Sequence, residues 1–136
     1  GHQRSGKELD IDFEALVRTR GTLVFLMGVT ALPNIRAGLL AAGMDPATPA
    51  AVVERGTTPA QRRISATLET LGQAAEQARV ESPAVIVVGS VCALAEQFDW
   101  FDSLPLKGKT VVVTRPKERI GTLSARLRSL GAQVWE

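Results

Sequence analysis

The segment ERGTTPAQRR, residues 54–63, holds the residues whose types and order favour chemistry most clearly. It overlaps the end of the apolar run Ala50–Gly56, which has the pattern of a buried strand ending at a turn glycine. Its threonines, glutamine and arginines bring hydrogen-bond donors and cationic groups to that turn. In α/β proteins, ligands bind where a buried strand passes its backbone into a glycine turn and a helix N-terminus. We therefore expect binding or catalysis at residues 54–63.

A helix is predicted directly after this turn. Thr58, Pro59 and Gln61 fit the Ncap, N1 and N3 positions of a capping box. Apolar residues then recur at helical spacing as far as about Arg79, which predicts a helix with one face on a sheet. These residues are Ile64, Leu68, Leu71, Ala75 and Ala78.

The elements around this segment alternate between strands and helices, which predicts the α/β class. Strands are expected at Thr22–Val29, Ala50–Glu54, Ala84–Val88 and Thr110–Thr114. Helices are expected at Phe13–Arg20 (with Asp12 as N-cap), at Leu32–Ala42 and at Val91–Gln97. Because Thr22–Val29 is apolar throughout, we expect both of its faces to be covered.

Composition narrows the classes of function. With 136 residues, 45% of them hydrophobic, the chain is long enough for one domain, or for one domain and part of another. A net charge of +2 without a basic stripe argues against a nucleic-acid surface. One cysteine, Cys92, and one histidine, His2, argue against disulfides and metal sites. No run is long enough for a membrane span. A single cysteine fits a reducing cytoplasm, where we expect the protein. Cys92 lies in an apolar segment, and we expect it in the core.

The chain changes character at Phe98–Gly108, where two aromatic residues are followed by a proline and a glycine. A strand and a helix follow, and Gln133–Trp135 has the pattern of a second strand. A strand–helix–strand unit that stops there cannot close a sheet of its own. We therefore place a domain boundary near residue 105.

The runs TLVFLMGV, AAVVERGTTPAQR and PAVIVVGSVCAL, in this order, resemble the C-terminal half of the tetrapyrrole methylases, and within them the uroporphyrinogen-III C-methyltransferases. The resemblance covers residues 1–104 and implies the C-terminal lobe of that fold, a mixed sheet flanked by helices. Residues 105–136 resemble the first strand–helix–strand unit of a uroporphyrinogen-III synthase. The family's glycine-rich cofactor loop belongs to an N-terminal lobe that these residues do not include. The chain thus resembles part of a bifunctional enzyme, and we expect it to be inactive by itself.

The resemblance also implies a cofactor site. Met27 and Gly56 take the places of family residues that contact S-adenosylmethionine (SAM), and Gly28 and Gly89 are further candidates. A methionine thioether moulds to a ligand, and a glycine lets a nucleoside approach the backbone. From the residues alone, a core methionine and plain turn glycines remain open alternatives.

Uroporphyrinogen carries several carboxylates, which arginines bind in a bidentate manner. Arg55 and Arg62, with Arg63 beside them, are therefore the candidates for substrate binding. The alternative is a solvated charged turn, with Glu54 and Arg55 forming a salt link between lobes or subunits.

The resemblance implies SAM-dependent C-methylation of uroporphyrinogen III to precorrin-2 by a homodimer. Such a transfer needs positioning and desolvation rather than a metal, and the sequence offers no convincing catalytic base. The alternative is a non-catalytic dimerisation or ligand-binding module.

Overall fold

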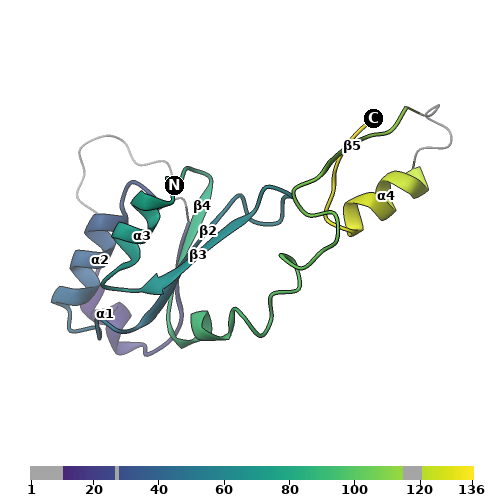
Figure 1. The fold of residues 1–136 in the computed structure, drawn as a ribbon. Coiled ribbons are helices and arrows are strands. Elements are labelled where there is room, and N and C mark those ends of the chain that lie inside the picture. Colours follow the sequence, from purple (N-terminus) through teal and green to yellow (C-terminus); the bar gives the residue numbers. More distant parts are fainter. Residues whose placement is uncertain (1–10, 27, 115–120) are drawn as a thin grey trace.

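The computed structural model describes residues 11–26, 28–114 and 121–136, which form two β-sheets with helices beside them (Figure 1). The larger sheet has the strand order β1-β4-β2-β3, and every neighbouring pair is antiparallel. Its strands are β1 (Leu23–Leu26), β2 (Pro49–Glu54), β3 (Arg62–Thr67) and β4 (Ala84–Val88). The smaller sheet pairs two strands in parallel. Helices and sheets together confirm the α/β class.

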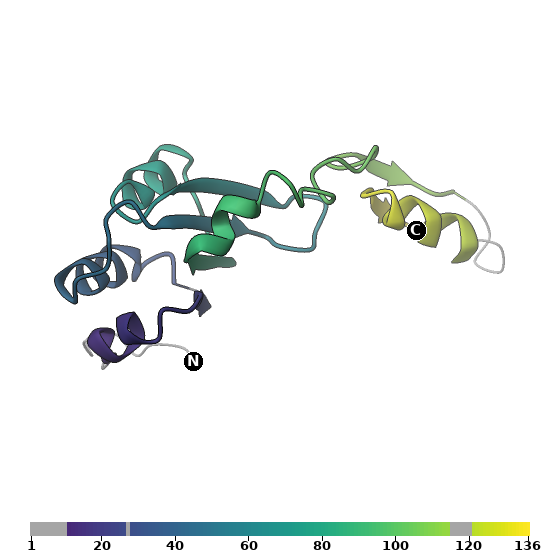
Figure 2. The same cartoon turned by 90° about the horizontal axis from the view of Figure 1, so that it is seen from below.

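Three helices and the core occupy one face of the larger sheet (Figures 1 and 2). They are α1 (Phe13–Arg18), α2 (Leu32–Ala41) and α3 (Leu71–Gln77). Leu39 of α2, Leu71 of α3 and Ile86 of β4 are completely buried between these layers. Burial of each such side chain contributes about 1.5–3 kcal/mol, so this contact holds the sheet in place.

The beginnings and ends of these helices follow local chemistry. The Asp12 carboxylate accepts a hydrogen bond from the Ala15 N–H at 2.9 Å, which confirms Asp12 as the N-cap of α1. Gly43 has a φ of +86°, and it follows α2 in the left-handed conformation that terminates helices. Gly38 of α2 leaves room for the Phe13 ring, which a side chain there would overlap. The predictions of helices after Asp12 and at Leu32–Ala42 are therefore confirmed, with α1 ending at Arg18 instead of Arg20.

The predicted helix between Thr58 and Arg79 is wrong, because this segment forms β3 and then α3. Residues 62–67 pair along the whole length of β2, from Glu54 opposite Arg62 to Pro49 opposite Thr67. The pairing satisfies the backbone of β2 on its second side, which a helix in this place would leave open. Helical spacing misled the prediction because Leu68, Leu71 and Ala75 do face the core, from a turn and a shorter helix.

The expectation that β1 is covered on both faces is also wrong. Val24 and Leu26 expose 56% and 74% of their surface, whereas Leu23 is buried against the helices. β1 lies at the edge of the sheet and pairs only with β4. The 3₁₀ helix η1 (Ser90–Leu94), which occupies most of the predicted Val91–Gln97 helix, lies on the outer face nearer to β2. The outer face of β1 therefore remains open.

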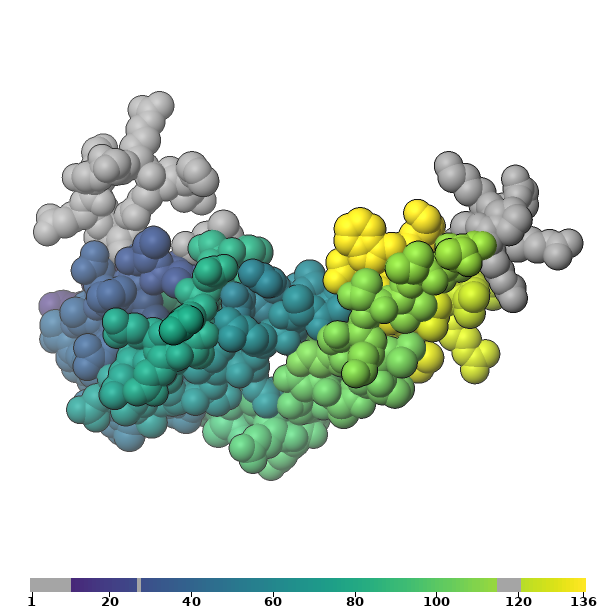
Figure 3. All heavy atoms as spheres, turned by 45° about the horizontal axis from the view of Figure 1, so that its top comes forward, coloured from purple at the N-terminus to yellow at the C-terminus, as the bar shows by residue number. Residues whose placement is uncertain are grey.

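The second sheet belongs to a strand–helix–strand unit at the C-terminal side of the chain. It consists of β5 (Thr110–Val112), α4 (Gly121–Ser129) and β6 (Gln133–Trp135), and β5 pairs with β6 in parallel. This unit lies at one end of an elongated molecule (Figures 1 and 3). The Leu106 N–H bonds the Leu130 carbonyl at 2.9 Å, which ties the connecting segment to this unit. The predicted order of strand, helix and strand is confirmed, while the domain boundary stays a prediction.

Candidate functional site

Three of the strands bring the candidate residues to one end of the larger sheet. β1 and β2 finish there, at Leu26 and Glu54, and β4 begins there. Val85 of β4 is the Cα partner of both Leu26 and Val53, so the ends of β1 and β2 lie two strand spacings apart, about 10 Å. We call this the hairpin end of the sheet, because the β2–β3 hairpin turns there.

The hairpin loop, residues 55–61, is closed by its own side chains. The Thr58 hydroxyl donates to the Arg55 carbonyl at 2.7 Å, and the Thr57 N–H donates to Gln61 Oε1 at 2.7 Å. Thr58 and Gln61 were predicted to cap a helix, and they instead stabilise a turn. Arg55 and Thr57 have φ values of +49° and +68°, in the left-handed region that costs a residue with a side chain about 1–3 kcal/mol.

Gly56 lies between these two left-handed residues and is exposed. Neither its N–H nor its carbonyl forms a hydrogen bond within the described residues. A Cβ at this position would come no nearer than 3.4 Å to another atom, that of Val53 Cγ1. The backbone of Gly56 is therefore accessible to a ligand, with a free donor and a free acceptor.

Gly28 follows β1 at the same end of the sheet, but it is buried. A Cβ there would lie 2.9 Å from Ile86 Cδ1 and 3.3 Å from Ile35 Cδ1. Close packing between β4 and α2 thus explains this glycine without a ligand. Met27, the predicted cofactor contact beside it, lies outside the described residues.

Gly89 follows β4, which runs in the opposite direction, and so it lies at the other end of the sheet. Its φ is +146°, and a Cβ there would lie 3.2 Å from Thr22 Cα. Its N–H donates to the Pro49 carbonyl at 2.9 Å. The structure brings Gly28 and Gly56 to one end and separates Gly89 from them by the length of β4.

Glu54, the last residue of β2, is a buried carboxylate with only 2% of its surface exposed. Arg62 Nε donates to its Oε2 at 2.6 Å, and a second guanidinium nitrogen forms an ion pair with the same oxygen. The Glu81 N–H donates to Oε1 at 3.3 Å. Both oxygens thus have partners, as a buried charge requires.

Arg62 and Arg55 differ in how far their guanidinium groups are committed. Arg62 also donates to the carbonyls of Ala78 and Arg79, at 3.2 and 3.4 Å, so its nitrogens serve the end of α3 as well as Glu54. Arg55 pairs with the exposed Glu81 at 3.5 Å and with Glu54 at 4.0 Å. The side chains of Arg55 and Arg62 are about equally exposed, at 47% and 50%, but that of Arg55 donates no hydrogen bond within the described residues. Of these two predicted substrate-binding residues, Arg55 is the more available.

Arg63, the third predicted arginine, points to the opposite face of the sheet. Its guanidinium donates to Asp99 Oδ2 at 3.0 Å and to the Ala95 carbonyl at 3.1 Å. It holds the segment after η1 against β3, on the far side from Glu54. The structure therefore does not bring Arg63 together with Arg62.

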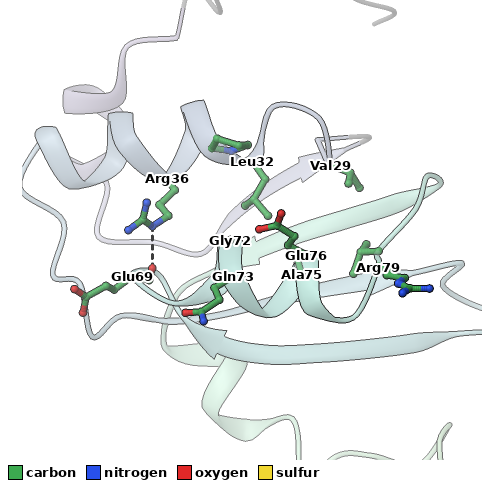
Figure 4. Close-up of a pocket in the computed structure, with 11 residues that line it drawn as sticks. Val29, Leu32, Arg36, Glu69, Gly72, Gln73, Ala75, Glu76 and Arg79 are labelled. Atoms are coloured by element: carbon green, nitrogen blue, oxygen red, sulfur yellow. Dashed lines mark hydrogen bonds between the residues drawn. The ribbon is translucent and has the colours of Figure 1, made fainter.

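Two cavities, each of about 700 Å³, meet at Arg79 near the hairpin end. One is polar and joins the hairpin to the connecting segment; it is lined by Glu54, Arg55, Pro59, Ala60, Gln61, Arg62, Ala78, Arg79, Glu81, Lys107 and Gly108. The other is a groove between α2 and α3, where Arg36 Nε donates to the Glu69 carbonyl at 2.9 Å (Figure 4). Arg79 lines both cavities, is exposed and has a φ of +49°.

Arg79 and Lys107 were not predicted from the sequence. Arg79 stands at the end of α3, and no motif around it drew attention. The break at Glu81-Ser82-Pro83, just after Arg79, is the one signal that could have indicated a chain reversal beside the hairpin. Lys107 reaches the polar cavity only because the connecting segment folds back toward the hairpin.

Cys92 lies on η1, where its Sγ contacts the Val87 carbonyl at 3.5 Å. Burial raises the pKa of this thiol above its ordinary value, so it is protonated at neutral pH.

Among the described residues, no group of three or more histidine, cysteine, aspartate or glutamate side chains is placed to hold a metal ion. The helices of the same residues include none with the length and apolar character of a membrane span.

The chain is thus an α/β protein with an antiparallel sheet and an accessible glycine loop at one end. Residues 3–72 match the family described as Tetrapyrrole (Corrin/Porphyrin) Methylases. Since this match covers more than half of the 136 residues, the chain belongs to the tetrapyrrole methylases.

Curated relatives extend this likeness over the rest of the chain. It is 50% identical over 136 residues to the Porphyrin biosynthesis protein HemD of Ruminiclostridium josui, covering all of this chain and 27% of that protein. It is 35% identical over 127 residues to the Uroporphyrinogen-III C-methyltransferase of Bacillus subtilis, covering 93% of this chain and 26% of the relative. The chain therefore spans about a quarter of the length of these relatives.

A solved structure shares the fold over part of the chain. It is the uroporphyrin-III C-methyl transferase from Thermus thermophilus complexed with S-adenyl homocysteine. The match has a TM-score of 0.54 at 37% identity, over 62% of this chain and 37% of that one. The predicted partial lobe of a tetrapyrrole methylase fold is confirmed by this likeness.

Proposed function

We propose that this chain is one lobe of a longer SAM-dependent methyltransferase, and that Gly56 forms part of its cofactor site. The observation that carries the proposal is the exposed backbone of Gly56, with an unused donor and acceptor at the end of β2. Family membership supports it, and so does the S-adenyl homocysteine bound to the Thermus relative. Gly28, at the same sheet end, packs against Ile86 and Ile35 of the core.

The residues present fit one wall of such a site. The absence of a Cβ at Gly56 lets a nucleoside lie against the loop, where its polar groups meet the free N–H and carbonyl. When bound, SAM supplies an electrophilic methyl group on a sulfonium centre. The part of this chain is to hold that group in line with an electron-rich carbon and to keep water away. The opposite wall, with the glycine-rich loop of the family, lies in the rest of the longer protein.

The substrate proposed is uroporphyrinogen III, methylated to precorrin-2. Arg55 is half-exposed beside Gly56, and the exposed Arg79 lines the adjoining polar cavity. Guanidinium groups in these positions suit the propionate and acetate carboxylates of a tetrapyrrole. Arg62, although predicted to bind substrate, contributes in this proposal mainly by holding Glu54.

We further propose that residues 105–136 open a fused uroporphyrinogen-III synthase. The parallel β5–α4–β6 unit supports this, since such a unit needs more strands to form a domain. The likeness to HemD of Ruminiclostridium josui, which continues through all 136 residues, also supports it. A fusion of this kind brings together an enzyme and the one that makes its substrate, in the cytoplasm.

A homodimer is the assembly we propose for the longer protein. The outer face of β1, with Val24 and Leu26 exposed at a sheet edge, is an apolar surface whose burial in a subunit interface would be favourable. The same exposed face keeps the second candidate function open, a non-catalytic dimerisation module. The two differ in one property, which is binding of the cofactor.

The experiment that tests the proposal is a methyl-transfer assay with uroporphyrinogen III and SAM. The full-length protein containing this chain is expected to form a dimethylated product, and the 136-residue chain alone is expected to form none. Met27→Ala in the full-length protein should reduce turnover. Methyl transfer by the 136-residue chain alone would contradict the proposal that the opposite wall of the cofactor site lies elsewhere in the longer protein. A full-length protein that dimerises but is inactive would favour the non-catalytic dimerisation module.

A further inference from the structure

The hairpin loop holds two residues in an unfavourable backbone conformation on either side of Gly56. The bonds of Thr58 and Gln61 close this loop internally, but they do not fix it to the sheet. Its position depends on the residues where the strands end, which are Glu54 and Arg62. What these two residues contact therefore decides where Gly56 lies.

Glu54 joins three segments through contacts that no other carboxylate among the described residues duplicates. Its Oε2 binds Arg62, which begins β3, and its Oε1 accepts from the N–H of Glu81, in the turn before β4. Arg62 carries the link further, to the carbonyls of Ala78 and Arg79 at the end of α3. The base of the hairpin loop is thus fixed to the α3–β4 turn by a buried charge.

A second link makes the same connection from the loop itself. The Arg55 N–H donates to the Pro83 carbonyl at 2.8 Å, and the Arg55 side chain pairs with Glu81 at 3.5 Å. Both partners, Pro83 and Glu81, belong to the turn before β4. The Glu81 N–H in the same turn donates to Glu54. Movement of Glu54 would therefore move the partners of Arg55, and with them the left-handed residue that precedes Gly56.

We infer that Glu54 is a positioning residue for the cofactor site: through Arg62 and the turn before β4 it holds the hairpin loop so that Gly56 presents its free backbone groups. The inference rests on the proposed function, because it takes Gly56 as a cofactor contact. Glu54 is only 2% exposed and both of its oxygens already have partners, so it acts through the loop. An ordinary stabilising ion pair would leave ligand affinity unchanged.

The adjacent strand position supplies a matched control. Arg63 follows Arg62 in β3 and makes the same kinds of contact, with one carboxylate and one carbonyl, on the other face of the sheet. Its partners lie after η1 and not in the hairpin loop. Replacing each arginine by lysine removes the planar fork and keeps the charge. The two substitutions are therefore the same change in adjacent strand residues, and only Arg62 contacts a residue at the base of the hairpin loop.

The test measures S-adenosylhomocysteine binding by calorimetry in the full-length protein. Arg62→Lys and Glu54→Gln should each raise the Kd for S-adenosylhomocysteine about tenfold. They should raise the KM for SAM by a similar factor, with little change in kcat. In Arg63→Lys both constants should stay within about twofold of the wild-type values. Hydrogen exchange of the Thr57 N–H should quicken in Arg62→Lys but not in Arg63→Lys, which holds even if Glu54→Gln fails to fold.

Three results bear on the inference differently. Wild-type affinity in Arg62→Lys, or equal weakening by Arg63→Lys, would overturn the positioning role and leave the proposed function intact. Unchanged exchange at Thr57 in Arg62→Lys would overturn it as well. Failure of the wild-type protein to bind S-adenosylhomocysteine would overturn the proposed function, and the inference with it.

Discussion

Glu54 and Arg62 face each other across the last pair of the β2–β3 ladder, and Arg62 Nε donates to Glu54 Oε2 at 2.6 Å. The two partners are unequally exposed, because the carboxylate is buried whereas half of the Arg62 side chain reaches solvent. Removing Arg62 should therefore destabilise the protein by a different amount from removing the Glu54 charge. The ion pair closes the hairpin that carries Gly56.

Arg62→Ala is expected to destabilise the hairpin by about 3–5 kcal/mol, because it takes from the buried Glu54 charge its nearest cationic partner. Glu54→Gln should cost less, about 1–3 kcal/mol, since the half-exposed Arg62 can turn to water. Native-state hydrogen exchange of the β2 and β3 amides in the full-length protein measures both. Equal effects of the two substitutions would contradict the asymmetry.

Gly28→Ala is expected to destabilise the protein by about 1–3 kcal/mol, since the new methyl group would press on Ile86 Cδ1 from 2.9 Å. Ile86→Val removes that methyl group and should restore part of the loss in the double variant. Thermal unfolding of the four proteins gives the coupling. Gly121→Ala is the control, because nothing lies within 4 Å of its added Cβ. Additive effects at 28 and 86 would contradict the packing explanation.

Gly89→Ala should lower stability by about 1–3 kcal/mol, because alanine rarely adopts a φ of +146°. Affinity for S-adenosylhomocysteine should nevertheless stay unchanged in the folded variant, because Gly89 lies at the sheet end opposite Gly56. Calorimetry at a temperature below the unfolding transition measures this. A selective loss of affinity would restore the original prediction of Gly89 as a cofactor contact.

Cys92 should react slowly with thiol reagents at pH 8, because burial raises the pKa of its thiol and so lowers the thiolate fraction. The raised pKa also sets the direction in which the free energy of unfolding changes with pH. The neutral thiol is favoured in the folded state, so its contribution is complete below the ordinary value of 9.0 and is lost as the pH rises through the folded pKa. Comparing labelling rates with and without denaturant checks the first claim, and equal rates would refute it.

Much of the fold could be predicted because its signals are local. Asp12 precedes a helix, Gly43 ends one, and the apolar run Ala84–Val88 forms a strand as its pattern predicts. The segment after Gly56 was mispredicted because its conformation is decided by pairing with β2 and not by its own apolar spacing. Apolar spacing across a strand, a turn and a helix there imitated a single helix.

The candidate site was only partly predictable for a similar reason. The residue types at Arg55, Gly56 and Arg62 indicated a site, and the structure does place all three at one sheet end. Their division of labour depends on Glu54, whose burial follows from three-dimensional packing. Arg79 joins the site only because α3 ends beside the hairpin, and the strand direction that removes Gly89 is a property of the topology.

The most direct test of the account is calorimetric titration of S-adenosylhomocysteine into the full-length protein and its Gly56→Ala variant. A Cβ at Gly56 meets nothing closer than 3.4 Å and its φ lies outside the left-handed region, so the variant should fold with unchanged stability. We expect wild-type binding and a loss of at least about tenfold in the variant, because the methyl group would occupy space that the nucleoside needs. Equal affinity of the two proteins would contradict the account.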